Sequence, residues 1–216
     1  MPALITWWTL DVRSLAPAAH NDTVTAVGSR LLARWTEPAR RYHTTTHLVE
    51  MFWALEDLEL AGAVDDRGGT LGRVAAWFHD AVYDPRALPG ANEAASADLA
   101  RESLRQLGLD EDHRRTVATL VEMTAGHDLD GDDPVGSAFH DADLWVLSAP
   151  QERFDEYCAQ VREEYAHIDE DAYRAGRAAI LEPLLHRDRI YRTTAALREW
   201  EAAARVNLGR ELARLR

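Results

Sequence analysis

The sequence predicts an all-α protein that forms a single domain over residues 1–216. Apolar residues recur at helical spacing along most of the chain, and no convincing alternation typical of strands is present. Residues that favour helix starts and stops divide the chain into segments of ordinary helix length. No repeat, low-complexity tract or linker interrupts it. We expect a helical bundle in which residues 150–216 pack on a motif-bearing segment of about 40–148.

Start and stop signals place the helices in order. The predicted helices cover about residues 21–36, 42–61, 71–83, 91–108, 110–125 and 137–148, with three more after Pro150, Asp169 and Arg192. Asn21 and Asp22 are typical caps, Gly108 is a typical C-terminal stop, and Asp110 is placed to cap the next helix. The stretches 63–69 and 126–136, rich in glycine and aspartate, predict loops.

Composition indicates an ordinary globular protein, with 46% hydrophobic and 28% charged residues. The formal net charge of −13 argues against nonspecific nucleic-acid binding, although a locally positive pocket would still accept a small phosphorylated ligand. The single cysteine, Cys158, excludes an intramolecular disulfide and a zinc site built from several thiolates. The stretch MPALITWWTLDVR lacks the features of a signal peptide, and no segment is long and apolar enough to span a bilayer. We therefore expect a cytoplasmic protein without membrane contact.

Histidines and aspartates on apolar segments form the most informative pattern. His43 and His47 in RRYHTTTHLVE are four residues apart, so on a helix they share one face. His79 and Asp80 follow in AAWFHDAVYD, and Asp143 in FHDADLWVL. Imidazole nitrogen and carboxylate oxygen suit divalent metals, and a titratable group on an apolar face must be paired, shifted in pKa or metal-bound. This order of residues predicts a metal-dependent hydrolase.

Each of these histidine and aspartate motifs also has an ordinary structural explanation. Histidines at this spacing often flank a core face. His-Asp dipeptides recur at His127-Asp128, in an acidic glycine-rich loop, and at His140-Asp141, which shares the apolar context and remains a competitor. The helix dipole explains an aspartate at position 141 near a helix start, whereas Asp143 directly precedes the apolar run LWVL.

Together these motifs resemble the HD superfamily of metal-dependent phosphohydrolases, whose ligand order is His, His-Asp, Asp on an all-helical core. YHTTTH is similar to the YHxxxH element of cyclic-nucleotide phosphodiesterases in that superfamily. R-x-YH-x3-H, FHDAVYDP, NE-x2-SA, T-x2-H and DADLWVL are similar to a bacterial group of predicted HD phosphohydrolases, from about Arg40 to the C-terminal ARVNLGREL. The resemblance implies an HD-type helical bundle with phosphohydrolase activity.

The resemblance also implies roles for single residues. The implied metal ligands are His47, His79, Asp80 and Asp143. His43 matches the position that protonates the leaving oxygen. Asp143 is preferred to Asp141 because the family aspartate directly precedes the buried stretch. His140 stands where this group more often carries an apolar residue, and we expect a helix-face histidine there. The mixed nitrogen and oxygen set suits Mn, Fe, Co, Ni, Zn or Mg.

Further candidates surround the ligands. Asn92 and Glu93 begin the helix that follows the loop after His79-Asp80. There they either act as an ordinary cap and first-turn carboxylate or face the pocket. His127 either reaches a second metal or a substrate phosphate, or is a solvated loop histidine. Arg40 either neutralises phosphate or lies on the surface. Three residues of the C-terminal third either help to close the pocket or form structural ion pairs: Arg162, Glu164 and Arg177.

The expected reaction is hydrolysis of a phosphoester or phosphoanhydride in a small phosphorylated ligand, a nucleotide being one candidate. A divalent ion lowers the pKa of coordinated water from about 15.7 towards 7. Asp80 orients that water, and His43 donates a proton to the departing group. The alternative is a noncatalytic metal- or nucleotide-binding module on the same scaffold. His43 favours the enzyme, because a binding module needs no proton donor.

Overall fold

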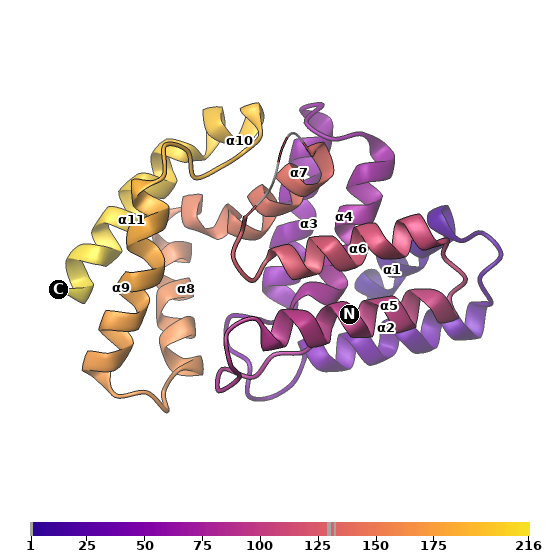
Figure 1. Cartoon of the computed structure of the whole chain (residues 1–216), viewed down its shortest axis with the longest axis horizontal. Coiled ribbons are helices and arrows are strands. Elements are labelled where there is room, and N and C mark those ends of the chain that lie inside the picture. The colour runs from indigo at the N-terminus through magenta and orange to yellow at the C-terminus, as the bar shows by residue number, and fades with distance from the viewer. Residues whose placement is uncertain (1, 129–130, 132) are drawn as a thin grey trace.

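The computed structural model describes residues 2–128, 131 and 133–216, which form a helical structure (Figure 1). Eleven α-helices and one 3-10 helix make up the regular structure of these residues, and none of them forms a strand. In chain order the elements are α1 (Pro2–Leu15), α2 (Asn21–Trp35), α3 (Thr45–Leu60), α4 (Asp66–His79), α5 (Ala91–Gln106), α6 (Glu111–Met123), α7 (Pro134–Asp143), η1 (Leu144–Ser148), α8 (Gln151–Glu164), α9 (Glu170–His186), α10 (Thr194–Glu199) and α11 (Glu201–Leu215). The predicted all-α class is confirmed.

The N-terminal helix α1 lies outside the predicted set of helices. Its Leu4, Trp8 and Val12 recur every four residues and are buried, which is the spacing of one helix face. The indole N–H of Trp8 donates to the Val24 carbonyl at 2.8 Å and ties α1 to α2. Gly28 leaves room for this indole, because a Cβ there would overlap it. Neither α1 nor any other helix of the described residues is long and apolar enough to cross a bilayer.

Two helices near the ligands have other boundaries than predicted. Helix α3 begins at residue 45 rather than near 42, because the Thr44 side chain caps it. Helix α4 begins inside a stretch predicted as loop, where the Asp65 side chain accepts a hydrogen bond from Gly68 N at 2.7 Å. It ends at His79 rather than near residue 83, so Asp80 lies just beyond its last turn.

Helix α7 also begins earlier than predicted. Pro134 occupies its first position, where a missing N–H is not needed, and the Asp133 side chain caps it. The predicted loop 126–136 therefore ends sooner than expected, and its residues 129, 130 and 132 lie outside the described residues. The predicted cap at Asp110 is present and accepts a hydrogen bond from His113 N at 2.8 Å.

Two hydrophobic clusters form the interior, and they share two helices. The first contains Trp8, Trp35 and Trp77 and lies among α1 to α7, and the second lies mainly among α7, η1 and the four C-terminal α-helices. Helices α3 and α7 contribute to both, with Met51 and Phe139 in the first and Leu55 and Ala142 in the second. The C-terminal helices thus pack beside α3 and α7 as part of one compact unit (Figure 1).

Candidate metal centre and cleft

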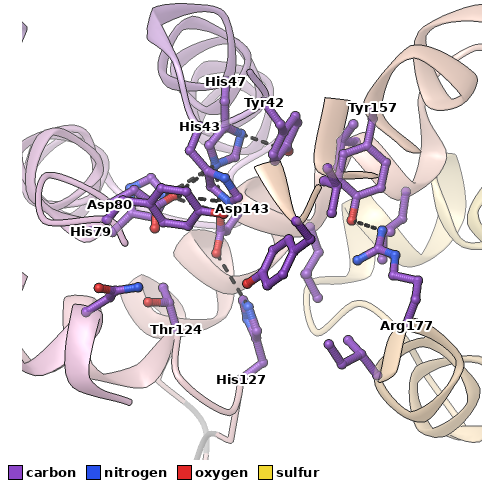
Figure 2. Close-up of a pocket in the computed structure, with 18 of the residues that line it drawn as sticks. Tyr42, His43, His47, His79, Asp80, Thr124, His127, Asp143, Tyr157 and Arg177 are labelled. Atoms are coloured by element: carbon purple, nitrogen blue, oxygen red, sulfur yellow. Dashed lines mark hydrogen bonds and ion pairs between the residues drawn. The ribbon is translucent and has the colours of Figure 1, made fainter. Parts of the chain in front are cut away.

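Three mutually packed helices, α3, α4 and α7, and the residue that follows α4 bring four side chains to one point (Figure 2). The Nε2 atoms of His47 and His79 are 3.2 Å apart. Asp143 Oδ1 lies 3.2 Å and 3.4 Å from these two nitrogens. Asp80 Oδ2 lies 2.9 Å from His79 Nε2 and 3.8 Å from His47 Nε2. We call these four residues, which the sequence singled out as ligands, the His-Asp cluster.

The His-Asp cluster has separations that fit a metal site. Ligand atoms about 2.1 Å from a common ion lie about 3.0 to 3.4 Å apart in octahedral and tetrahedral sites, close to most of the distances above. The second nitrogen of each ring is also fixed. His79 Nδ1 donates to the Ala76 carbonyl at 2.9 Å, and His47 Nδ1 lies 3.0 Å from Tyr42 Oη. Such contacts orient ligating histidines. His47, His79 and Asp80 therefore form a group that could hold a metal ion.

The charges inside the cluster are strongly coupled. Burial alone would lower the pKa of His79, but Asp80 and Asp143 raise it well above the usual imidazole value. Burial alone would raise the pKa of each aspartate. The imidazoles of His79 and His43 hold the pKa of Asp80 below its usual value, and those of His79 and His47 do the same for Asp143. Two ionised and largely covered carboxylates thus lie close together, and either a proton on an imidazole or a bound cation compensates their charge.

His43 lies in the turn before α3 and not on the helix, yet it lines the same cleft as His47. The two imidazole centroids are 6.1 Å apart. His43 Nε2 lies 3.9 Å from Asp80 Oδ2, and its Nδ1 donates to Glu164 Oε2 at 2.6 Å. The ring is therefore held from behind and presents Nε2 towards the cluster, which is the orientation a proton donor requires.

Glu164, the last residue of α8, fixes this ring. Its Oε1 accepts hydrogen bonds from the backbone N–H groups of residues 41–43 at 2.7, 2.9 and 3.1 Å, and its Oε2 also accepts one from the Tyr83 hydroxyl. Burial would raise the pKa of Glu164, but His43 and the backbone N–H groups lower it to about 2. In the sequence Glu164 looks like its exposed neighbour Glu163. Glu163 forms an exposed ion pair with the Arg41 side chain, whereas only Glu164 is buried and accepts hydrogen bonds from the backbone of residues 41–43 and from the His43 ring.

The competing pair His140-Asp141 has a structural role. Asp141 lies in the last turn of α7, so the favourable dipole of a helix start does not explain it. Its carboxylate accepts hydrogen bonds from Arg192 N at 2.7 Å, Thr193 N at 2.8 Å and His140 Nδ1 at 3.0 Å. It therefore anchors the segment that leads into α10. His140 is fully buried, and its ring lies 5.1 Å from that of His127.

Arg40 is buried and does not line the cleft. Its guanidinium donates to the carbonyl oxygens of Asp80 at 2.7 Å, His43 at 3.1 Å and Ala81 at 3.2 Å. It also lies over the Trp35 ring. These contacts differ from both sequence expectations, a phosphate ligand and a surface residue. Arg40 instead joins the turn before α3 to the turn after α4.

Asn92 and Glu93 both line the cleft near the start of α5. Neither is the cap, because Gly90 occupies that position with φ of 79°. Asn92 Oδ1 accepts a hydrogen bond from Asp84 N at 3.1 Å, and its Nδ2 donates to the Asp84 carbonyl at 3.0 Å. Asn92 thus fixes the loop after the HD pair. The Glu93 carboxylate has no hydrogen-bond partner among the described residues and is open to the cleft.

His127 reaches the cluster from the segment after α6. Its Nε2 lies 3.4 Å from Asp143 Oδ2, and its buried Nδ1 has no hydrogen-bond partner within the described part of the chain. Burial lowers the pKa of His127 to about 4, although Asp143 opposes this shift. The backbone φ of 53° lies in the left-handed region, which is uncommon for residues other than glycine. The ring is thus neutral at pH 7 and held beside the ligands.

A cleft of about 480 Å³ opens over the cluster, within the usual size range of small-molecule sites. The cluster lies on one side, and α8 and α9 form the opposite side (Figure 2). These two helices and their connection contribute mainly aromatic and aliphatic side chains: Tyr157, Val161, Tyr165, Ile168, Tyr173 and Ile180. The same side carries one arginine, Arg177.

The site therefore combines a largely buried centre suited to a cation, a histidine fixed by a carboxylate, and an open cleft beside them. The sequence singled out His43 and the four residues of the His-Asp cluster. It left Glu164 and Arg177 between pocket and structural roles, because these residues come close to the site only through the packing of α8 and α9. Comparison of the chain with protein-family models, curated proteins and solved structures gives no match in any of the three.

Proposed function

We propose that this protein is a divalent-metal-dependent phosphohydrolase of HD type that cleaves a phosphoester or phosphoanhydride of a small phosphorylated ligand. The observation that carries the proposal is the convergence of two imidazoles and two carboxylates from distant segments, with His43 beside them. The ligands would be His47, His79, Asp80 and Asp143. A surface cluster would seldom combine this burial with this donor set.

The residues have distinct tasks in the proposed reaction. When bound, a divalent ion lowers the pKa of coordinated water towards about 7 and so supplies a nucleophile at neutral pH. The Asp80 carboxylate lies between His79 and His43 and orients the attacking water. His43 holds a proton at Nε2 and transfers it to the departing oxygen. Glu164 stabilises the imidazolium through its bond to Nδ1.

A noncatalytic metal- or nucleotide-binding module would use the same cluster. In such a module the contact between His43 and Glu164 would have no function, because this contact orients the His43 ring as a proton donor requires. The buried carboxylate of Glu164 is held by the backbone and therefore restrains His43 more strongly than packing alone would. This contact favours the enzyme.

Metal analysis and turnover of one pair of variants test the proposal. His79→Ala/Asp80→Ala should lose stoichiometric metal and all hydrolysis of phenyl phosphate while circular dichroism remains helical. The matched control His20→Ala/Asp22→Ala removes a solvent-exposed His-Asp pair and should keep both properties. Full metal content in the first variant would overturn the ligand assignment. Stoichiometric metal in the unchanged protein with no turnover of any phosphoester would support the binding module.

A further inference from the structure

We propose that Arg177 forms a second anion-binding position in the cleft, so that the substrate carries an anionic group in addition to the phosphate at the His-Asp cluster. The inference rests on the proposed function for the phosphate end. It names the chemical class of the substrate: a small phosphoester whose other end is a carboxylate or a second phosphate.

Arg177 is a buried cation without a buried anion. Its side chain is on α9, and the residue is only 8% exposed. Its Nη2 donates to Tyr157 Oη at 2.5 Å, and the guanidinium lies 5.0 Å from the Tyr157 ring centroid. Its Nε is buried and has no hydrogen-bond partner, and no carboxylate of the described residues forms an ion pair with it. Burying a charge without a partner is costly, so a missing anionic partner is the simplest explanation.

Other arginines of α8, α9 and α11 show the usual arrangement. Four of them form ion pairs with carboxylates: Arg153 with Glu50, Arg162 and Arg174 with Glu170, and Arg210 with Asp155. All four are less buried than Arg177, yet each has a carboxylate partner. The absence of such a partner at the most buried of these positions therefore distinguishes Arg177 from its neighbours.

The position of Arg177 in the cleft indicates which chemical group of a ligand it would bind. It lies on the α9 side, across the cavity from the His-Asp cluster (Figure 2). A guanidinium matches the oxygens of a carboxylate or phosphate through two parallel hydrogen bonds. The wall of the cleft also carries Tyr157, Tyr165 and Ile168, which suit an apolar or ring-containing part of the ligand. The overall charge of −13 disfavours anions elsewhere, so Arg177 supplies local attraction.

Calorimetric binding of unreactive phosphonates to the manganese-loaded protein tests the inference. The probes are alkylphosphonates of increasing chain length and the same chains ending in a carboxylate or a second phosphonate. At the best chain length the terminal anion should tighten binding about 10- to 150-fold, the range of a hydrogen bond to a charged group. If the terminal carboxylate increases affinity more, the second anionic group of the substrate is a carboxylate. If the second phosphonate increases it more, that group is a phosphate.

Variants separate Arg177 from the rest of the cleft. Arg177→Gln should remove the gain, and Arg177→Lys, which keeps the charge if the glutamine variant fails to fold, should retain part of it. Arg174→Gln, on the same helix but outside the cleft, should retain all of it. Metal-dependent binding of plain alkylphosphonates with no gain at any chain length, or a gain that survives in Arg177→Gln, would overturn this inference alone. Failure of every phosphonate to bind with manganese would overturn the proposed function as well.

Discussion

Replacing Glu164 by glutamine tests whether His43 is the proton donor. Oε1 of Glu164 accepts three backbone N–H bonds, so the amide oxygen of Glu164→Gln should occupy that position. The NH₂ group then faces His43 Nδ1, where it is a donor and not an acceptor. The neutral ring takes the other tautomer, and the imidazolium loses its charge-assisted hydrogen bond.

The size of the effect follows from this one bond. A hydrogen bond to a charged group contributes about 1.5–3 kcal/mol, which corresponds to about 10- to 150-fold in rate. Turnover of phenyl phosphate by the manganese-loaded variant should fall by this factor with unchanged metal content. Turnover of 4-nitrophenyl phosphate should change little, because nitrophenolate departs without a proton. Glu163→Gln replaces the exposed neighbouring carboxylate and should leave both rates unchanged.

Two comparisons decide whether the reasoning holds. His43→Ala should lose about 10²–10⁴-fold with the same dependence on the leaving group, and His47→Ala should lose metal and activity for both substrates. In the double variant of His43 and Glu164 the loss should equal that of His43→Ala, because Glu164 acts through the ring. Equal losses for both phosphates, or additive losses in the double variant, would refute the assignment of Glu164 as a positioning residue.

Four further outcomes are expected. Asp143→Asn should lose metal and keep its helices, which metal analysis and circular dichroism would show. Asp141→Asn should keep metal but lower the free energy of unfolding in urea by about 1–3 kcal/mol, because a buried N–H loses its acceptor. The opposite result for the two variants would exchange the roles of these aspartates. Gly28→Ala should destabilise by about 1–3 kcal/mol through overlap with Trp8, while Gly209→Ala, which meets no neighbour, should be neutral or stabilising; equal melting temperatures would contradict this. Burial raises the pKa of the Cys158 thiol to about 12, so a disulfide reagent at pH 8 should react slowly with the native protein and rapidly in urea. Because the pKa of Glu164 falls from 4.5 to about 2 on folding, its contribution to stability is present above pH 4.5 and is lost as the pH falls towards 2. In chelator-treated protein, Glu164→Gln should reduce the dependence of the unfolding free energy on pH between about 2 and 4.5. An unchanged slope in that range would contradict the shift.

Local signals in the sequence were sufficient for the helical class and singled out the residues of the His-Asp cluster, whose role as metal ligands stays a prediction. Apolar spacing predicted α2, α5 and α6 closely, and Asp110 was identified as a cap because its chemistry is local. The chain order of His47, His79-Asp80 and Asp143 predicted their convergence, because titratable groups on apolar faces require partners. Their separations in the structure agree with that expectation.

Tertiary contacts decide what the sequence left open. The glycines at 68 and 69 predicted a loop, yet Gly68 lies in the first turn of α4, where Val64 and Val135 leave no room for a side chain. Glu164 and Arg177 could not be separated from surface residues of the same type, since their surroundings come from the turn before α3 and from Tyr157 of α8. Arg40 likewise shows its role only through carbonyl groups forty residues away in sequence.

The carbonyl contacts of Arg40 have a consequence for how the protein responds to chelators. The guanidinium holds the backbone of His43 and Asp80 together, and the rings of His47 and His79 have their own protein partners, Tyr42 and Ala76. The segments that carry the His-Asp cluster are therefore held by protein contacts, and we expect the chain to fold without an ion. Removal of metal should leave a cooperative, helical apoprotein, and added metal should raise the melting temperature only as mass action on a preformed site requires.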